Sequence, residues 1–241
     1  MGIDLPQRIV CLTAESAEIL YRLGAGDRVV GVSGYSLYPP EVREKPKVGG
    51  YTTVRVDKVL ELCPDLVLAF SELQAGAVAD LIKRGVSVLT LNQKSLKEVL
   101  QAILIIGSLV GKEREARALM GEMLSRFEEV RAKASTLPGR PRVYFEEWPE
   151  PLITGLKWVS ELIELAGGED IFSDLSQGSH ARDRIVEPDE VRRRNPELII
   201  ASWCGRRVKM DTIINRPGWG EITAVKEGRI YEIKSPYLLQ P

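Results

Sequence analysis

Aromatic and polar side chains follow four short apolar segments of this sequence, at the positions where predicted strands end. The residues concerned are Tyr35, Tyr38 and Phe70 in the first half of the chain and Glu147, Trp148 and Trp203 in the second half. In open α/β sheets, ligands bind beyond the carboxyl ends of the strands. Aromatic rings accompanied by a few polar groups suit a large, flat, partly apolar ligand. We therefore expect these side chains to contact such a ligand; the alternative is that the rings pack an interface between two parts of the protein.

His180 and Cys204 are the two candidates for a metal ligand. His180 is the only histidine and lies in a Ser-Gln-Gly-Ser-His segment that we predict to be a mobile loop. From such a loop an imidazole could reach a cobalt or iron atom. Cys204 could supply a thiolate. The alternatives are an isolated surface histidine and a buried, unreactive thiol.

Two adjacent carboxylates, Glu146 and Glu147, do not have the spacing of an acid/base pair. On a strand, neighbouring side chains point to opposite faces, so only one of the two can face a ligand. The sequence also lacks a Gly-x-Gly-x-x-Gly motif, a Walker lysine motif and a Gly-x-Ser-x-Gly elbow. We therefore predict a binding protein rather than an enzyme.

Alternating strand and helix patterns position these residues. Short apolar segments predict strands, and apolar residues at every third or fourth position predict helices. The predicted strands span residues 8–12, 28–32, 66–70, 86–91, 143–145 and 198–201, and the predicted helices span residues 14–23, 56–62, 75–84 and 95–109. This alternation is typical of parallel sheets covered by helices.

Residues 56–69 and 188–201 share one pattern at a constant offset of 132 positions. Asp57 matches Asp189, and each segment consists of a helix, a proline, an acidic residue and an apolar strand in that order. An internal duplication explains this order, and chance similarity between two helix-strand units is the alternative. Two copies predict two similar α/β lobes.

One long helix is predicted between the two copies, over residues 112–134. Apolar residues recur there at steps of three or four, with charged residues between them, and Pro138 follows. At 1.5 Å per residue the helix is about 34 Å long, enough to span a small domain. We expect it to join two lobes, with its apolar stripe packed along both; a core helix in a single domain is the alternative. The predicted organisation is residues 1–110 for the first lobe, 111–137 for the linking helix and 138–241 for the second lobe.

The composition argues against several classes of function. The chain has 241 residues, of which 44% are hydrophobic and 28% charged, and a net charge of −1. These values are typical of a globular protein and give no sign of a nucleic-acid-binding surface. The longest apolar run, residues 102–106, is far shorter than the roughly 20 residues that span a bilayer. The three widely separated cysteines form neither a metal-ligand pair nor a disulfide framework.

The ordered set of segments resembles the cobalamin and ferric-siderophore substrate-binding proteins of ABC importers. The segments that carry the resemblance are residues 8–12, 27–32, 35–40, 57–65, 161–172 and 229–233. The resemblance implies the class III periplasmic-binding-protein fold, in which two Rossmann-like α/β lobes with parallel sheets are joined by one long backbone helix. It also implies that a transported ligand is held in the cleft between the lobes and that the protein has no intrinsic cofactor.

Within that family the cobalamin-binding members are the most similar, because Tyr-x-x-Tyr-Pro-Pro at residues 35–40, followed by Tyr51, resembles their corrin-facing segment. The resemblance implies that Tyr35 and Tyr51 flank the ring of cobalamin or another corrinoid. Glu147 departs from the family, which has an aromatic residue at that position, although Trp148 lies beside it. A buried carboxylate there requires a hydrogen-bond donor or a proton, which leaves a ferric siderophore or haem as an alternative ligand.

The same family docks on the permease of the importer through one acidic residue at the tip of each lobe. The repeat places Asp57 and Asp189 at matching positions, each at the start of a short helix. The resemblance therefore implies that these two residues contact the permease. The alternative is that each carboxylate caps backbone N–H groups of its own helix. Exposed ion pairs give orientation more than affinity, which suits a transient partner.

We expect a monomer that acts in the periplasm or at the cell surface, as the resemblance implies. The first residues show neither a basic segment nor an apolar signal core, and the last residues show no terminal helix. We therefore expect either that an export segment and a final helix are missing from this sequence or that the protein is cytoplasmic. The second case favours a rival from another class, a cytosolic chelatase-like enzyme that acts on tetrapyrroles or metals. The lack of a convergent acid/base set argues against that rival.

Overall fold

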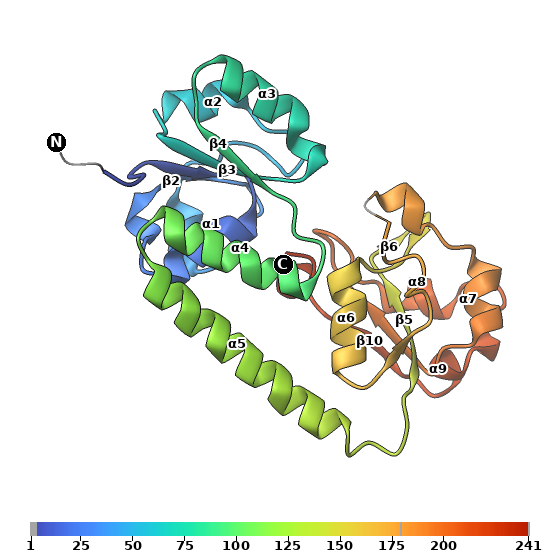
Figure 1. The fold of residues 1–241 in the computed structure, drawn as a ribbon. Helices are drawn as coiled ribbons and strands as arrows, with labels where there is room; N and C mark the ends of the chain where they lie inside the picture. The colour runs from blue at the N-terminus through green and yellow to red at the C-terminus, as the bar shows by residue number, and fades with distance from the viewer. Residues whose placement is uncertain (1–3, 179, 241) are drawn as a thin grey trace. The chain divides into compact units, whose positions relative to one another are not determined.

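The computed structural model describes residues 4–178 and 180–240. The chain forms two compact units, residues 1–124 and 125–241, each built around a four-stranded parallel sheet (Figure 1). The boundary between the units falls inside the long helix α5, Glu113–Ala134. It therefore lies within the segment 111–137 that the sequence predicts as the linking helix.

The first unit contains a sheet of strand order β2-β1-β3-β4. Its strands are β1 (Ile9–Cys11), β2 (Val29–Val32), β3 (Leu66–Phe70) and β4 (Val88–Leu91). Its helices are α1 (Ala14–Arg22), α2 (Val56–Glu61), α3 (Ala75–Lys83) and α4 (Leu96–Leu109), with short 3-10 segments η1 (Gly26–Arg28), η2 (Pro40–Glu44) and η3 (Glu72–Gln74). The strands and helices predicted for this half are confirmed, with shifts of one or two residues at their ends.

Along β1 and Leu12, which directly follows it, alternate residues face opposite sides of this sheet, and a different pair of helices covers each side (Figure 1). Ile9 and Cys11 pack with residues of α1 and α4, whereas Val10 and Leu12 pack with residues of α2 and α3. All four side chains are buried. Burial on both faces explains why the strands appear in the sequence as continuous apolar runs. Polar side chains therefore occur mainly in the loops that follow the strands.

The second unit contains a sheet of strand order β10-β9-β5-β8 and a small antiparallel hairpin, β6-β7. Its strands are β5 (Arg142–Glu146), β6 (Trp148–Pro149), β7 (Leu152–Ile153), β8 (Glu169–Asp170), β9 (Leu198–Ala201) and β10 (Ile230–Glu232). Its helices are α6 (Lys157–Leu165), α7 (Pro188–Arg194), α8 (Met210–Ile214) and α9 (Thr223–Lys226), with 3-10 segments η4 (Ala181–Arg184), η5 (Trp219–Glu221) and η6 (Ser235–Tyr237). Tyr144, Phe172 and Trp219 are fully buried in its core. The ring centroid of Tyr144 lies 5.8 Å from that of Phe172 and 5.9 Å from that of Trp219.

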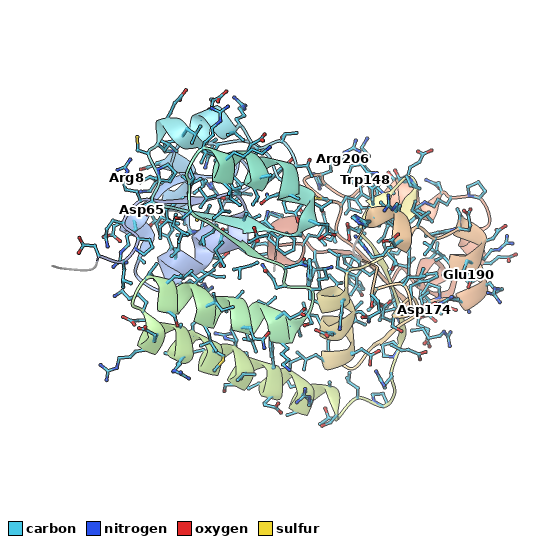
Figure 2. The ribbon with its side chains drawn as sticks, turned by 45° about the horizontal axis from the view of Figure 1, so that its top comes forward. Arg8, Asp65, Trp148, Asp174, Glu190 and Arg206 are labelled. Atoms are coloured by element: carbon cyan, nitrogen blue, oxygen red, sulfur yellow. The ribbon has the colours of Figure 1, made fainter. Side chains whose placement is uncertain are left out.

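The two units repeat one arrangement of strands. In the first, Arg8 N donates to the carboxylate of Asp65 at 3.0 Å (Figure 2). In the second, Arg142 N donates to Glu197 Oε2, also at 3.0 Å. The arginine side chains also donate to backbone carbonyls just past the ends of α2 (Val56–Glu61) and α7 (Pro188–Arg194). Arg8 Nε donates to Cys63 O and Arg142 Nε to Asn195 O, each at 3.1 Å. The same contacts at matching positions support the internal duplication.

The apolar stripe of α5 is buried over only part of its length. Ala116 and Leu119 are buried in the core cluster of the first unit. Leu124 and Val130, further along the stripe, are 43% and 41% exposed. The expectation was that the stripe packs along both lobes; its buried residues, Ala116 and Leu119, lie near the start of the helix, in the first unit. Among the described residues, no helix has both the length and the apolar character needed to cross a membrane.

Candidate functional site

In the first unit, two of the predicted aromatic residues, Tyr51 and Phe70, lie together at the end of β3. The ring centroids of Tyr51 and Phe70 are 6.0 Å apart, and the ring planes are inclined by 50°. The buried side chain of Gln74 holds this arrangement: Oε1 accepts from Phe70 N at 2.9 Å, and Nε2 donates to Tyr51 O at 2.8 Å. A further bond joins Nε2 to Leu12 O at 3.2 Å. One amide thus connects the ends of β1 and β3 with the loop that carries Tyr51.

Tyr35 and Tyr38 lie in the loop that follows β2. Tyr35 is 50% exposed, and Tyr38 is half-buried. Gly34 N donates to Gly49 O at 2.8 Å, which ties this loop to the segment that precedes Tyr51. The structure therefore places an exposed ring, Tyr35, and a half-buried ring, Tyr51, on neighbouring loops.

Glu15 is a buried carboxylate that the sequence did not single out. It lies in the first turn of α1, just beyond the end of β1, and is 9% exposed. Burial raises the pKa of Glu15 to about 7, and a hydrogen bond with Thr13 opposes this rise only in part. Near neutral pH the group is therefore divided between its charged and neutral forms. No sequence pattern distinguishes Glu15 from other acidic residues, because these are common in the first turn of any helix.

A cavity of about 310 Å³ lies beside α3 in the first unit. It is lined by Ser71, Glu72, Ala75, Val78, Ala79, Ile82, Thr90 and Asn92. None of these residues belongs to the predicted aromatic set. Its lining begins at Ser71, directly after Phe70, and we assign no ligand to it.

In the second unit, Glu147 forms an ion pair with Arg184. Arg184 Nη1 lies 2.6 Å from Glu147 Oε2, and Nη2 lies 3.3 Å from Oε1. The side chain of Glu147 is 15% exposed and that of Arg184 is 3% exposed. A carboxylate in this position requires a donor, and Arg184 supplies it. The charge of Glu147 is therefore balanced within the protein.

Glu146, the last residue of β5, has a different set of partners and is fully buried. Its carboxylate accepts from Arg216 Nη2 at 2.9 Å and from Trp203 Nε1 at 3.0 Å. Trp203 is 4% exposed and belongs to the core cluster of this unit. This placement corrects the expectation that Trp203 contacts a ligand, because its ring packs in the core and its single N–H group is used internally. The side chains of Glu146 and Glu147 thus have different partners, as expected for neighbouring residues that point to opposite faces of a strand.

Trp148 lies at the start of the β6-β7 hairpin and is half-buried. Its Nε1 donates to Glu150 O at 2.9 Å. The guanidinium carbon of Arg206 lies 5.2 Å from the centroid of the Trp148 ring (Figure 2). This is within the range of a cation–π contact. The sequence marked Trp148 but not Arg206, because their separation in the chain hides the contact.

His180 and Cys204 lie in loops of the second unit and are not part of any three-residue metal-binding group among the described residues. His180 precedes η4, and its backbone N donates to Asp183 Oδ2 at 3.2 Å. Although part of Cys204 is exposed, desolvation of the thiol and then the charge of Glu147 raise its pKa, which disfavours the thiolate. Across residues 4–178 and 180–240, no group of three His, Cys, Asp or Glu side chains could hold a metal ion. That His180 or Cys204 ligates a metal carried by the ligand stays a prediction. Ser179, in the predicted loop, lies outside the described residues.

Asp57 and Asp189 occupy equivalent places in the two units. Each is the second residue of its helix, and each side chain is 84% exposed. Asp57 lies 3.4 Å from Arg84 Nη1, and Asp189 lies 3.2 Å from Arg192 Nη2. The capping alternative lacks the N-cap position that it requires, because Arg55 and Glu187 occupy those positions.

Comparisons with known proteins agree with this architecture. A family model described as periplasmic binding protein matches residues 9–237. An uncharacterised ABC transporter substrate-binding lipoprotein of Bacillus subtilis (strain 168), YvrC, is 35% identical over 238 residues, which cover 95% of this chain and 73% of the relative.

Two solved structures have the same fold. The periplasmic vitamin B12 binding protein BtuF of Vibrio cholerae has a TM-score of 0.78 at 26% identity, covering 98% of this chain and 91% of that chain. A protein of Staphylococcus epidermidis ATCC 12228, described as a possible iron-binding (periplasmic solute-binding) protein, has a TM-score of 0.80 at 26% identity, covering 95% and 90%. The predicted class III fold is confirmed.

Proposed function

Because this chain belongs to the periplasmic binding protein family, we propose that it is the substrate-binding component of an ABC importer and that the ligand it delivers is a corrinoid. It captures the ligand and passes it to a permease without a chemical step. The observation that carries this proposal is that each unit, taken by itself, has an aromatic edge that is exposed or half-buried: Tyr35 with Tyr51 in the first unit, and Trp148 in the second. The similarity to a vitamin B12 binding protein supports the choice of ligand.

The contacts within the first unit favour a flat ligand. Tyr51 is backed by Phe70, which is 9% exposed and therefore supports the tyrosine ring more than it meets solvent. Tyr35 stands out from the neighbouring loop at 50% exposure. Covering exposed aromatic surface with a large ring system gives a favourable hydrophobic contribution at little cost in side-chain entropy. Tyr38, half-buried on the same loop, extends this surface.

The pairing of Glu147 with Arg184 makes the second unit compatible with a corrinoid. A carboxylate held by one guanidinium keeps lone pairs that accept further hydrogen bonds. The edge of a corrin ring carries amide groups, whose N–H donors match such an acceptor. Glu147 therefore does not require a cationic ligand. Trp203, which is buried, is left out of the proposed contact set.

The test is an equilibrium titration with aquocobalamin, followed by its absorption spectrum. Tyr35→Ala and Tyr51→Ala should each weaken binding about tenfold, consistent with the loss of a ring contact of 1–1.5 kcal/mol. Tyr231→Ala is a matched control, because Tyr231 is 54% exposed but lies on β10 of the other unit. Unchanged affinity in both test variants would remove the aromatic edge of the first unit from the proposal.

The same spectra report whether a protein side chain ligates the cobalt. A shift of the absorption bands on binding that His180→Ala abolishes would assign His180 as the axial ligand, and Cys204→Ser applies the same test to the thiol. The raised pKa of Cys204 makes it the weaker candidate. Binding without a band shift would show that neither residue reaches the metal.

A ferric siderophore is the second candidate ligand. The similarity to the Staphylococcus epidermidis protein, described as possibly iron-binding, favours it. Haem is a further flat alternative that the exposed tyrosines could accommodate. Titration with one ligand of each class separates these possibilities, because the corrinoid should bind most tightly.

We propose that Asp57 and Asp189 contact the permease from their exposed positions. Each side chain is 84% exposed, and among the described residues each forms an ion pair with one arginine of its own unit. Exposed pairs of this kind exchange partners readily, because they contribute little to stability. A place of action in the periplasm or at the cell surface follows from the same proposal, supported by the similarity to a transporter lipoprotein.

A further inference from the structure

Arg206 is held in place by the loop that follows β9. Its backbone N donates to Trp203 O at 3.1 Å. The preceding Gly205, with φ of +66°, donates from its N to Ser235 Oγ at 3.1 Å. On the facing hairpin, Trp148 is fixed by the bond from Nε1 to Glu150 O. The loop and the hairpin together place the guanidinium 5.2 Å from the indole centroid (Figure 2).

Among the described residues, Arg206 differs from the more buried Arg184 and Arg216, whose charges are balanced by carboxylates. Arg184 pairs with Glu147, and Arg216 pairs with Glu146. For Arg206, which is exposed, the contacts of the described residues include the Trp148 ring but no carboxylate. A cation over an aromatic face keeps its in-plane N–H donors available. Those donors form a fork that matches a carboxylate or a phosphate.

We propose that the Arg206 guanidinium, held over Trp148, binds an anionic group, a phosphate ester or a carboxylate, at the periphery of the transported ligand. The proposal rests on the proposed function, because it assigns a charge to the same ligand that the aromatic edges bind. The Trp148 ring contacts apolar ligand surface, and the arginine forms an ion pair with the charged substituent beside it. A corrinoid with its phosphodiester-linked nucleotide should therefore be preferred to one without it.

Two corrinoids that differ in the phosphodiester provide the test. Isothermal titration with cyanocobalamin and dicyanocobinamide measures binding to the wild type, Arg206→Gln, Arg206→Lys and Arg207→Gln. We expect Arg206→Gln to weaken cyanocobalamin binding at least tenfold and dicyanocobinamide binding less than threefold. Arg206→Lys keeps the charge but loses the fork, so its effect on cyanocobalamin should be intermediate. Arg207, an exposed neighbour, is the matched control and should change neither affinity more than twofold.

An equal loss for the two corrinoids in Arg206→Gln would overturn the proposal, because it would show that the arginine only positions Trp148. No loss for either ligand would overturn it as well. If neither corrinoid binds the wild type, the proposed ligand class fails, and a separate probe decides on Arg206. That probe is inorganic pyrophosphate, followed by tryptophan fluorescence.

Trp148 should dominate the fluorescence response, because Trp158, Trp203 and Trp219 are at most 4% exposed. A saturable change in the wild type that is lost in Arg206→Gln and in Trp148→Phe would support an anion site at this position. No saturable change in the wild type, in a protein that also binds neither corrinoid, would overturn it.

Discussion

Glu147 and Arg184, which are 37 residues apart in the sequence, form a two-pronged ion pair with a shortest distance of 2.6 Å. Arg184 Nη1 also donates to the backbone oxygen of Thr154. The pair therefore joins the end of β5, the segment after β7 and η4, three parts of the chain that carry the candidate site of the second unit. The carboxylate of Glu147 is a component of this junction.

Removing Arg184 should destabilise the protein strongly. Arg184→Met leaves the carboxylate of Glu147 without its cation, and breaking one side of a buried pair costs about 3–5 kcal/mol. The free energy of unfolding from urea denaturation measures this loss. The double variant Glu147→Gln, Arg184→Met should lose less than the two single variants together. Unfolding of Arg184→Met at the wild-type urea midpoint would show that the pair has no structural role.

Stability should depend on pH through Glu15. The pKa of Glu15 is raised from 4.5 to about 7 in the folded protein, so the folded state binds this proton more tightly than the unfolded state. The contribution to stability is complete below about pH 4.5 and is lost as the pH rises to about 7.

Glu15→Gln removes this dependence. The variant should be more stable than the wild type at pH 8, by up to about 3 kcal/mol, and equal to it near pH 4. Glu18→Gln, which changes a carboxylate that pairs with Arg22 on the exposed side of α1, is the control. A constant difference between Glu15→Gln and the wild type from pH 4 to pH 8 would contradict the assignment.

Trp203 and Trp148 should respond differently to substitution. Trp203→Phe removes the bond to Glu146, and the loss of a hydrogen bond to a charged group lowers the free energy of unfolding by about 1.5–3 kcal/mol. Ligand affinity should then change less than threefold. Trp148→Ala should weaken ligand binding at least tenfold and leave the urea midpoint nearly unchanged. The opposite assignment of effects would return Trp203 to the contact set.

Asp57 and Asp189 should matter for transport and not for binding. The double variant Asp57→Asn, Asp189→Asn should bind the ligand with wild-type affinity, because both side chains are 84% exposed and each pairs with an arginine of its own unit. Uptake by the importer reconstituted in liposomes should fall at least tenfold. Glu113→Gln, on an exposed position of α5, serves as the control. Normal uptake by the double variant would reject docking through these residues.

The duplication could be predicted because its signal is local. Buried parallel strands are apolar runs, and the helix, proline and acidic residue before β3 and β9 recur in the same order. The structure adds that Cys63 and Asn195, at matching positions, have φ values of 45° and 44°. Asparagine often adopts this left-handed conformation and cysteine rarely does, so the sequence offered a signal for only one of the two. Helix ends held by Arg8 and Arg142 explain the shared geometry.

The candidate site was predicted less well because its decisive contacts are long-range. Trp203 follows a strand, as a ligand-contacting residue would, but its partner Glu146 lies 57 positions earlier. Gln74 connects three segments through one amide, and glutamine belongs to no motif that marks such a role. Arg206 becomes notable only when the hairpin brings Trp148 beneath it.

The most direct test of the central claim is a titration of the purified protein with aquocobalamin, cobinamide, haem and a ferric siderophore, each followed by its absorption spectrum. The proposal predicts saturable, stoichiometric binding of a corrinoid, at least tenfold tighter than the binding of haem or the siderophore. Tight binding of haem or the siderophore, with no spectral response to either corrinoid, would contradict it.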